Sequence, residues 1–278
     1  MFKNNYIRFH LKILFNIYRK IILKSDRKIF QYLFNIKSII LKSPARLKWE
    51  NNIFIFRDIN FPNLRHKIRA QRQCNDAYEF GLINRLNKLE SAYFLNEINF
   101  QSNDIFIDCG ANVGDLKLWF EYNNININYV GFEPSPIEFE CLKKNVSPSI
   151  VHNVGLWNEE GKINFFISSQ GADSSLIEPK EFDEVITVKV KTLNKFINKK
   201  IKCLKLEAEG AEPEILEGLD DKIKYVEFIS ADLGYERGKD CESTLVPVTN
   251  FLLEKGFELI NMNHIRISAL FKNKNLKK

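Results

Sequence analysis

The sequence predicts an α/β fold built on a mostly parallel β-sheet. Residues 105–107 form a short apolar run that ends in an acid and a glycine turn, and an amphipathic segment begins at Leu116. Residues 129–132 form a second apolar run, which ends in Glu133 and Pro134. Buried strands that alternate with helical segments are typical of α/β folds, because helices connect neighbouring parallel strands.

The composition predicts one sizeable domain with a basic appendage. The chain has 278 residues, of which 45% are hydrophobic, and this is enough to bury one core. Residues 1–50 contain 12 lysines and arginines against two acids, whereas the rest of the chain contains 29 against 33. We therefore expect a basic arm over residues 1–60 and a main domain over residues 61–278, with its core at about 104–272. The acidic balance of the main domain argues against a nucleic-acid surface.

The arm has the charge pattern of an amphipathic helix. Polar residues recur in it at spacings of three and four, and apolar residues cover the remaining surface. The polar positions are Arg8, Lys12, Asn16, Arg19, Lys20 and Lys24. We favour docking of this helix on the main domain or on a second subunit; the alternative is an anionic membrane surface, and nucleic acid is the least favoured partner. No apolar run in the arm approaches the roughly 18 residues needed to cross a bilayer.

The five cysteines indicate a reducing compartment. They show neither a C-x-x-C pair nor metal-ligand spacing. Cys109 and Cys203 fall inside expected strands, where a thiol is a small apolar side chain. We expect a cytoplasmic protein, peripheral on the inner face of the membrane if the arm binds lipid, and no structural zinc.

The turn within DIFIDCGANVG, residues 104–114, predicts a nucleotide-type binding site. Gly110 and Gly114 carry no Cβ, so backbone N–H groups and a helix N-terminus can face a ligand closely. Asn112 stands where a dinucleotide fingerprint has its middle glycine, and no phosphate-loop lysine is present, so a pyrophosphate fits poorly. The remaining common ligand is S-adenosylmethionine, with Asp108 as a further candidate contact.

Two later strand ends supply the other candidate contacts for this cofactor. Glu133 follows about one βα unit after the glycine turn, where a carboxylate can accept both ribose hydroxyls. Asn153 and Val154 end a third expected strand, residues 150–154, and are well placed to meet an adenine edge. A simple turn role for Asn153 is equally favoured.

The segments between these motifs are expected to cover the site. Residues 77–99 indicate one or two helices near the cofactor turn, preceded by a solvated His66. Residues 161–167 and 185–190 alternate as strands around a polar loop that contains Ser174. We favour a flap over the site, with Ser174 as a candidate substrate contact, over a plain surface hairpin.

Acidic residues follow the fourth expected strand, residues 202–206. Strand periodicity puts Glu207 and Glu209 on one face. At the carboxyl end of a central strand they are candidates for binding the methyl acceptor or taking its proton. The acids at 212, 214 and 217 are sufficiently explained by a short helix that begins at Pro213.

The fifth expected strand, residues 225–230, leads to a loop on the same side. Asp232 in this loop is a candidate for binding a hydroxylated acceptor, and an ion pair with Arg237 is an equally favoured alternative. A helix at 245–255 and a hairpin formed by residues 257–262 and 265–271 complete the chain.

Together these residues resemble the FkbM-type methyltransferases, a branch of the class I S-adenosylmethionine-dependent enzymes. The resemblance spans residues 77–271. It rests on DIFIDCGANVG, on GFEPSP at 131–136, on NVGL at 153–156, on GADSSL at 171–176 and on KLEAEGAEPEILEGL at 205–219. The family usually has Asp at the position of Glu207 and Ala at the position of Gly155.

The resemblance implies a Rossmann-like, mostly parallel seven-stranded sheet with helices on both faces and an antiparallel edge from the last hairpin. It also implies in-line O-methylation of a hydroxyl on a sugar, glycan or related natural product. Glu209 is our first choice for acceptor contact and Glu207 the second; a divalent metal is compatible with these acids, but no spacing predicts one. The alternatives are an RNA or protein methyltransferase, and a non-catalytic S-adenosylmethionine-binding protein tethered by its arm.

Overall fold

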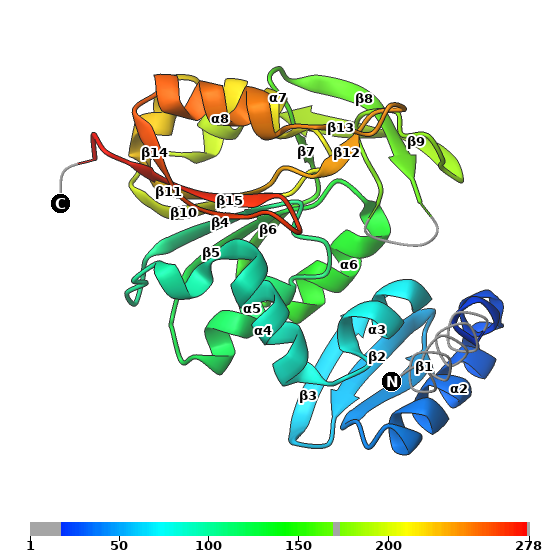
Figure 1. Cartoon of the computed structure of the whole chain (residues 1–278). Coiled ribbons are helices and arrows are strands. Elements are labelled where there is room, and N and C mark those ends of the chain that lie inside the picture. Colours follow the sequence, from blue (N-terminus) through cyan, green and yellow to red (C-terminus); the bar gives the residue numbers. More distant parts are fainter. Residues whose placement is uncertain (1–17, 169–172, 277–278) are drawn as a thin grey trace, which may run out of the picture. The chain divides into compact units, whose positions relative to one another are not determined.

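The computed structural model describes residues 18–168 and 173–276, and the chain divides between Ile83 and Asn84 into two compact units (Figure 1). The sequence analysis expects the basic arm to end at residue 60. The strands on either side of residue 60 pair with one another, and the main sheet is formed by later residues. Among the described residues, no helix is both long enough and apolar enough to span a bilayer.

The first unit is a small α/β assembly. After a helical stretch at residues 18–24, its elements are α2 (Arg27–Ile40), β1 (Ala45–Glu50), β2 (Ile53–Asp58), β3 (Phe61–Ile68) and α3 (Gln71–Tyr78). The three strands form an antiparallel sheet in the order β1-β2-β3. Phe30 and Phe34 of α2 pack beside Phe54, and Phe56 packs against Tyr78, so the unit has an aromatic core of its own.

Part of the basic side of the expected arm is paired within the protein. Residues 1–17, which hold Arg8, Lys12 and Asn16, lie outside the described residues. Arg19 is paired with Asp76 at 2.5 Å. The expectation for His66 was wrong, because the residue is 2% exposed and its ring packs against that of Tyr78 in a tilted arrangement, with ring centres 5.7 Å apart.

The second unit contains the larger sheet and its helices. Its first helix, α4 (Leu82–Tyr93), begins at the unit boundary. The helical elements that follow are η1 (Leu95–Glu97), α5 (Asp115–Tyr122), α6 (Pro136–Asn145), η2 (Leu193–Phe196), α7 (Glu212–Glu217), η3 (Asp220–Tyr225) and α8 (Leu245–Glu254). The strands are β4 (Ile105–Cys109), β5 (Asn128–Phe132), β6 (Ile150–His152), β7 (Gly155–Leu156), β8 (Gly161–Ile167), β9 (Glu184–Lys191), β10 (Ile201–Leu206), β11 (Val226–Asp232), β12 (Tyr235–Arg237), β13 (Glu242–Ser243), β14 (Phe257–Asn263) and β15 (Ser268–Asn273).

The main sheet has seven strands in the order β14-β15-β11-β10-β4-β5-β6. The five strands from β11 to β6 are parallel, and β15 runs antiparallel to β11. Because β14 is in turn antiparallel to β15, the edge strand β14 runs with the parallel strands. The predicted mostly parallel sheet with a C-terminal antiparallel hairpin is confirmed, and its reversed strand is the second from the edge.

Helices cover both faces of this sheet, α7 and α8 on one face and α4 and α5 on the other (Figure 1). The alternation along β4 explains the two layers. Ile107 and Cys109 join the core cluster that includes Leu216 of α7 and Leu252 of α8. Phe106, the residue before Ile107, packs instead against Phe120 of α5, with ring centres 4.9 Å apart.

A second, three-stranded sheet lies in the order β7-β9-β8. β8 and β9 are the two strands expected around the polar loop, and they pair antiparallel from Gly161 to Ile167. Within that loop, residues 169–172 lie outside the described residues. Ser175 bridges back to Phe166 through two backbone hydrogen bonds, so the far end of the loop returns to β8.

Candidate active site

Three polar side chains stand side by side on neighbouring strands near the carboxyl ends of the main sheet. Residues Ser230, Lys205, Asp108 and Gly131 stand in register on β11, β10, β4 and β5. The Lys205 ammonium lies 3.0 Å from Asp108 Oδ1 and donates to the carbonyl oxygens of Cys109 and Gly110 at 3.1 and 2.8 Å. This buried cation therefore joins the carboxylate of β4 to the backbone of the glycine turn.

Asp108 has a second partner on the same face. Its Oδ2 accepts a hydrogen bond of 2.7 Å from the hydroxyl of Tyr129, and the carboxylate is only 1% exposed. A buried carboxylate needs such partners, because an unpaired charge is strongly disfavoured in a protein interior. The predicted acid at the end of the first strand is thus held rigidly at the start of the glycine turn.

Glu207, immediately after β10, is enclosed by three groups. Its carboxylate accepts from the hydroxyl of Tyr93, lies 3.3 Å from Lys205 Nζ, and pairs with Arg266 at 2.5 Å. Burial by itself raises the pKa of Glu207, but the charges of Lys205 and Arg266 outweigh it and lower the pKa to about 2. Glu207 is therefore a permanently ionised, fixed carboxylate at neutral pH.

Glu209 sits on a strained turn that its neighbours hold in place. Its φ of +52° lies in the left-handed region, which disfavours a residue with a Cβ by about 1–2 kcal/mol. Glu212 accepts from the backbone N–H of Ala208 at 2.8 Å, and Ser175 Oγ donates to the carbonyl of Glu209 at 2.8 Å. Strain of this kind persists only where surrounding contacts enforce it, and it is concentrated at functional sites.

The carboxyl group of Glu209 differs electrostatically from that of Glu207. Among the described residues, no cation forms an ion pair with Glu209. The same holds for Glu236, which is a residue of β12. Burial and the neighbouring charge of Glu236 raise the pKa of Glu209 well above its usual value. Burial and the charge of Asp232 raise the pKa of Glu236 to about 8. The edge therefore holds two carboxyl groups whose pKa values are raised above those of ordinary carboxyl groups.

The ion pairs in the loop after β11 differ from the predicted one. Arg237 does not pair with Asp232; it forms a two-pronged contact with Glu214 at 2.6 and 2.9 Å and donates to the carbonyl of Gly210. Asp232 accepts from Nε of Arg266 at 2.6 Å and from the backbone N–H of Gly234. Asp232 is 2% exposed, so its oxygens face the protein. Glu214 lies in the first turn of α7, where the sequence analysis expects it, and also pairs with Arg237.

The two glycines of the cofactor turn are required by close contacts within the protein. A Cβ at Gly110 (φ +72°) would lie 1.8 Å from the carbonyl oxygen of Glu207, and one at Gly114 (φ +86°) would lie 2.4 Å from Cγ1 of Val146. The predicted reason for these glycines was close approach of a ligand. The structure gives a different one, which is contact of the turn with the end of β10 and with the end of α6.

Glu133 contacts this same turn. Its Oε2 accepts from the backbone N–H of Asn112 at 2.8 Å, and its Oε1 accepts from the backbone N–H of Ser135 at 2.9 Å. Burial, together with the charge of Glu138, raises the pKa of Glu133 to about 8. Each carboxylate oxygen has two acceptor sites, so both oxygens retain one for a further donor such as a hydroxyl group.

The other residues predicted to contact the cofactor or the substrate form contacts within the protein. The side-chain amide of Asn153 donates to the carbonyls of Glu133 and Pro134 at 2.9 and 3.1 Å, which is the turn role considered for it. Val154 packs against the main core. Ser174 Oγ accepts from the backbone N–H of Ser168 at 3.0 Å and thereby closes the polar loop.

Sequence reasoning assigned no role to Tyr93, Lys205 or Arg266. Lys205 carried a signal, because a lysine within an otherwise apolar buried strand requires a buried partner. Tyr93 and Arg266 carried none, because they come from α4 and from the β14–β15 turn, and only tertiary folding brings them to Glu207.

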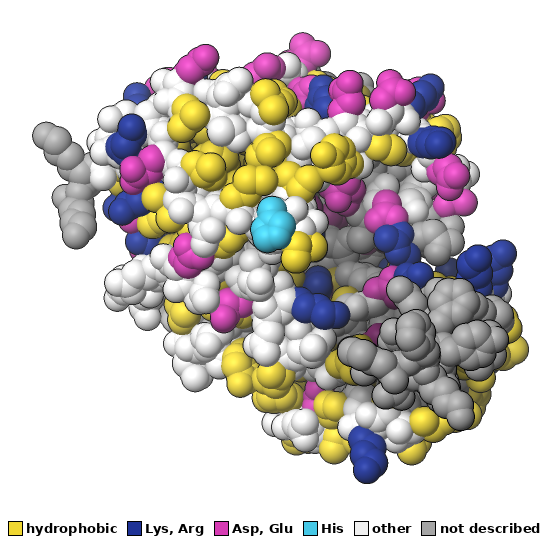
Figure 2. Space-filling model, in the orientation of Figure 1, with side chains coloured by type: hydrophobic (Ala, Val, Ile, Leu, Met, Phe, Trp, Pro, Cys, Tyr) yellow, Lys and Arg dark blue, Asp and Glu magenta, His cyan; other side chains and the backbone are white. Residues whose placement is uncertain are grey.

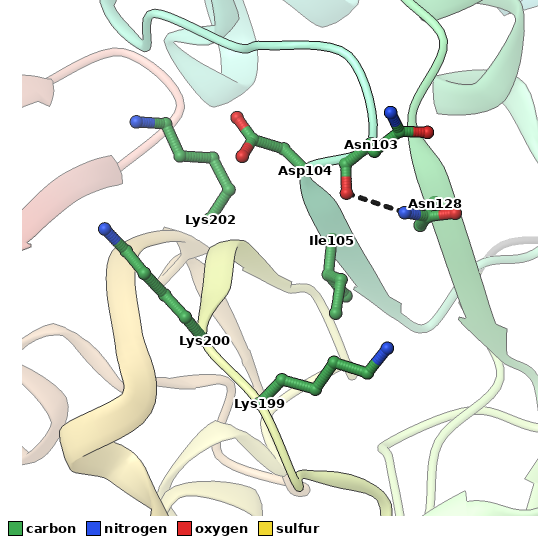
Figure 3. Close-up of a pocket in the computed structure, with 7 residues that line it drawn as sticks. All are labelled: Asn103, Asp104, Ile105, Asn128, Lys199, Lys200 and Lys202. Atoms are coloured by element: carbon green, nitrogen blue, oxygen red, sulfur yellow. Dashed lines mark hydrogen bonds between the residues drawn. The ribbon is translucent and has the colours of Figure 1, made fainter.

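A hollow of about 220 Å³ lies elsewhere on this unit (Figure 3). It is lined by Asn103, Asp104, Ile105, Asn128, Lys199, Lys200 and Lys202, which come from the amino ends of β4, β5 and β10. Lys200 and Lys202 both pair with Glu227. The hollow therefore lies at the opposite end of the strands from the acidic residues. Among the described residues, no group of three or more His, Cys, Asp or Glu side chains is arranged to hold a metal ion.

Three features define a class I methyltransferase fold. They are the strand order of the main sheet, the antiparallel direction of β15, which is the last of its seven strands in the sequence, and the acids at the ends of β4, β5 and β10. The sequence profile of the methyltransferase FkbM domain matches residues 108–275. This match covers more than half of the chain, and the protein belongs to the FkbM methyltransferase family.

Two fungal proteins are similar in sequence. "Methyltransferase 1" of Beauveria bassiana is 26% identical over 152 residues, which cover 44% of this chain and 61% of that protein. "Methyltransferase sdnD" of Sordaria araneosa is 21% identical over 186 residues, which cover 49% of this chain and 72% of that protein. The chain thus spans about three fifths of the first of these relatives.

Solved structures give partial overlaps. A putative rRNA methylase from Clostridium thermocellum aligns with a TM-score of 0.42 and 12% identity, over 66% of this chain and 94% of that one. TrmK of M. capricolum, in complex with S-adenosylhomocysteine, aligns with a TM-score of 0.36 and 12% identity, over 69% and 68% of the two chains.

S-adenosylmethionine is the cofactor of this family, and the residues present fit it. The cofactor carries ribose hydroxyls, which donate hydrogen bonds, and an amino-acid group with an ammonium and a carboxylate. Glu133 offers acceptors for the hydroxyls, whereas Asp108 is buried against Lys205 and Tyr129 and fixes the start of the turn. The turn has no phosphate-binding lysine, in keeping with a ligand that carries no phosphate.

Proposed function

We propose that this protein transfers the methyl group of S-adenosylmethionine to a hydroxyl group of a sugar, a glycan or a related natural product. The observation that carries the proposal is the state of Glu209. This residue lies on a strained turn that a hydrogen bond from Ser175 stabilises, and it pairs with no cation among the described residues. Burial and the charge of Glu236 raise the pKa of its carboxyl group. A carboxyl group with a raised pKa suits a hydroxyl acceptor, because its ionised form is a stronger base than an ordinary carboxylate.

S-adenosylmethionine supplies an electrophilic methyl group on a sulfonium. The acceptor oxygen forms the new C–O bond as the C–S bond breaks, the electron pair of that bond stays on sulfur, and the hydroxyl proton passes to Glu209. Alignment of the reacting atoms supplies most of the acceleration, since oriented reactions reach effective molarities on the order of 10⁵ M or more. Proton removal by Glu209 contributes roughly 10² to 10⁴-fold.

Glu207 has a positioning role in this proposal. With a pKa of about 2 it takes up no proton at neutral pH, and it holds Tyr93 and Arg266 beside the turn. The proposed acceptor is small or glycan-like; on the face shown in Figure 2, acidic and basic side chains are interspersed over the catalytic unit, without a continuous basic stripe. All five cysteines are free thiols, which supports a reducing compartment, and we propose the cytoplasm.

The base is tested by the pH dependence of kcat/KM. We expect kcat/KM to rise with pH and then level off, because Glu209 acts in its ionised form and because burial and the charge of Glu236 raise its pKa above the usual value. Glu209→Gln should lower kcat by roughly 10² to 10⁴-fold and leave the affinity for S-adenosylhomocysteine unchanged. Glu236→Gln should shift the rising limb to lower pH, since it removes a like charge.

Glu217→Gln is the matched control, because Glu217 lies exposed at the end of α7 and pairs only with Asn158 among the described residues. Its profile should equal that of the unmodified protein. A profile of the unmodified protein that is flat from pH 6 to 9, or full activity in Glu209→Gln, would reject Glu209 as the base.

The acceptor class is tested by incubating the protein with methyl-labelled S-adenosylmethionine and with separated lipid, glycan and nucleic-acid fractions. We expect label in sugar-containing material, stable to alkali as an ether is and a carboxyl ester is not. Label confined to nucleic acid or protein would replace the proposed acceptor. Binding of S-adenosylhomocysteine without any transfer would favour the non-catalytic alternative.

A further inference from the structure

The outer side of α2 in the first unit carries an apolar stripe. Ile29, Tyr32, Ile36, Ile39 and Ile40 are between 53% and 73% exposed. Their spacing places them along one face of the helix. We call these five residues the α2 stripe.

The stripe is distinct from the face that α2 uses for folding. The buried apolar residues of the helix are Phe30 and Phe34, which pack on the three-stranded sheet. A helix that is apolar on its folded side and on its outer side has more apolar surface than its own unit covers. Contiguous exposed apolar surface of this kind marks an interaction site rather than ordinary surface variation.

Unpaired lysines accompany the stripe. Four of them are exposed and have no acidic partner among the described residues: Lys20, Lys24, Lys28 and Lys42. Lys37, on the folded side of α2, is by contrast paired with Glu79. Residues 1–83 contain 17 lysines and arginines against five acids, whereas residues 84–278 contain 24 against 30. The positive charge of the protein is therefore concentrated in the unit that bears the stripe.

We propose that the α2 stripe and these four lysines form a surface that binds the interface of an anionic lipid membrane. An amphipathic helix binds such a surface by burying apolar side chains near the acyl boundary while lysines contact anionic headgroups. Tyr32, which is 65% exposed, has the aromatic side chain with a polar tip that is favoured at this depth.

Charge decides between this occupant and the alternatives. A second copy seated symmetrically on the stripe would bring its own Lys28 and Lys42 against those of the first, and like charges in an interface are unfavourable. Nucleic acid would satisfy the lysines but would leave the isoleucines against a polar backbone. An anionic membrane satisfies both sets of residues. This inference is independent of the proposed acceptor, because it concerns the first unit alone.

The test is flotation of the full-length protein with vesicles. We expect binding to vesicles that contain phosphatidylserine, little binding to vesicles of phosphatidylcholine alone, and loss of binding at high ionic strength. Ile36→Glu and Ile40→Glu should each weaken binding on the order of tenfold, because each removes an isoleucine from the buried set. Lys28→Gln should weaken it roughly fivefold.

Val246→Glu is the matched control, since Val246 is 67% exposed on α8 and lies far from α2 in sequence. It should bind vesicles as the unmodified protein does, and all variants should keep the unmodified melting temperature because the changed side chains are exposed. Equal binding to both vesicle types, or unchanged binding in Ile36→Glu, would overturn the proposal. A dimer in solution that Ile36→Glu converts to a monomer would assign the stripe to a second copy instead.

Discussion

At the scale of single residues, the glycine turn and the acidic strand end depend on each other. Gly110 has room for no side chain, because the carbonyl of Glu207 occupies the position of a Cβ. The same carbonyl precedes the turn that carries Glu209. A substitution at Gly110 therefore displaces both the cofactor turn and the proposed base.

We predict that Gly110→Ala lowers the free energy of unfolding by more than about 2 kcal/mol, since it combines a steric clash with a left-handed backbone. Gly161→Ala is the matched control, because nothing lies within 4 Å of a Cβ at that position, and it should change the free energy by less than about 0.5 kcal/mol. Urea unfolding measures both. Equal stability of the two variants would show that the turn can move away from β10.

Glu207 shows how one methylene changes the contacts of a carboxylate. The FkbM-type methyltransferases usually have Asp at this position. In this chain the longer side chain reaches the hydroxyl of Tyr93 and the guanidinium of Arg266. The carboxylate is thereby tied to two elements that lie far from β10 in sequence.

At the scale of elements, the β14–β15 hairpin fastens the catalytic edge. Arg266 extends from its turn and pairs with Glu207 after β10 and with Asp232 at the end of β11. Asp232 is buried, so it depends on this partner for compensation of its charge. The β14–β15 hairpin therefore has a second effect besides completing the sheet, because its turn brings a cation to the ends of two strands.

We predict that Arg266→Met lowers the free energy of unfolding by about 1–3 kcal/mol, because it leaves Asp232 buried without its partner. Asp232→Asn in the same chain should recover part of this loss, since it removes the uncompensated charge. Lys224→Met, which breaks the exposed pair with Asp221, serves as control and should leave the free energy of unfolding nearly unchanged. Strictly additive losses in the double variant would contradict the proposed coupling.

At the scale of the whole molecule, the chain separates a basic unit from a catalytic one. Every residue assigned to the cofactor or to the proposed base lies after residue 84. The first unit has its own sheet and aromatic core. Within this unit, Asp58 accepts a hydrogen bond of 2.8 Å from the backbone N–H of Leu82, where α4 begins.

We predict that a fragment of residues 82–278 folds and binds S-adenosylhomocysteine within about threefold of the full-length affinity, as expected of a domain with its own core. Its stability should fall by about 1 kcal/mol, because α4 loses the cap supplied by Asp58. Calorimetry and thermal unfolding measure the two effects. A fragment that folds but does not bind would move part of the cofactor site into the first unit.

Much of the fold could be predicted from local sequence. The strands expected at 105–107 and 202–206 followed from apolar runs and from the glycine turn, and the structure extends them to 105–109 and 201–206. The order of motifs along the chain also indicated the family. The sheet formed by residues 45–68 was not predicted, because its strands are short and carry no motif.

The sequence by itself determined which chemical groups end the strands, and therefore the cofactor and the class of enzyme, because strand ends and turns are set by neighbouring residues. Only the tertiary structure decided what those groups do. Glu207 and Glu209 are two residues apart and chemically identical, yet the first faces Lys205 and Arg266 while the second faces other carboxyl groups. The pKa of a carboxyl group depends on burial and on charges brought close in space, and these come from distant parts of the chain.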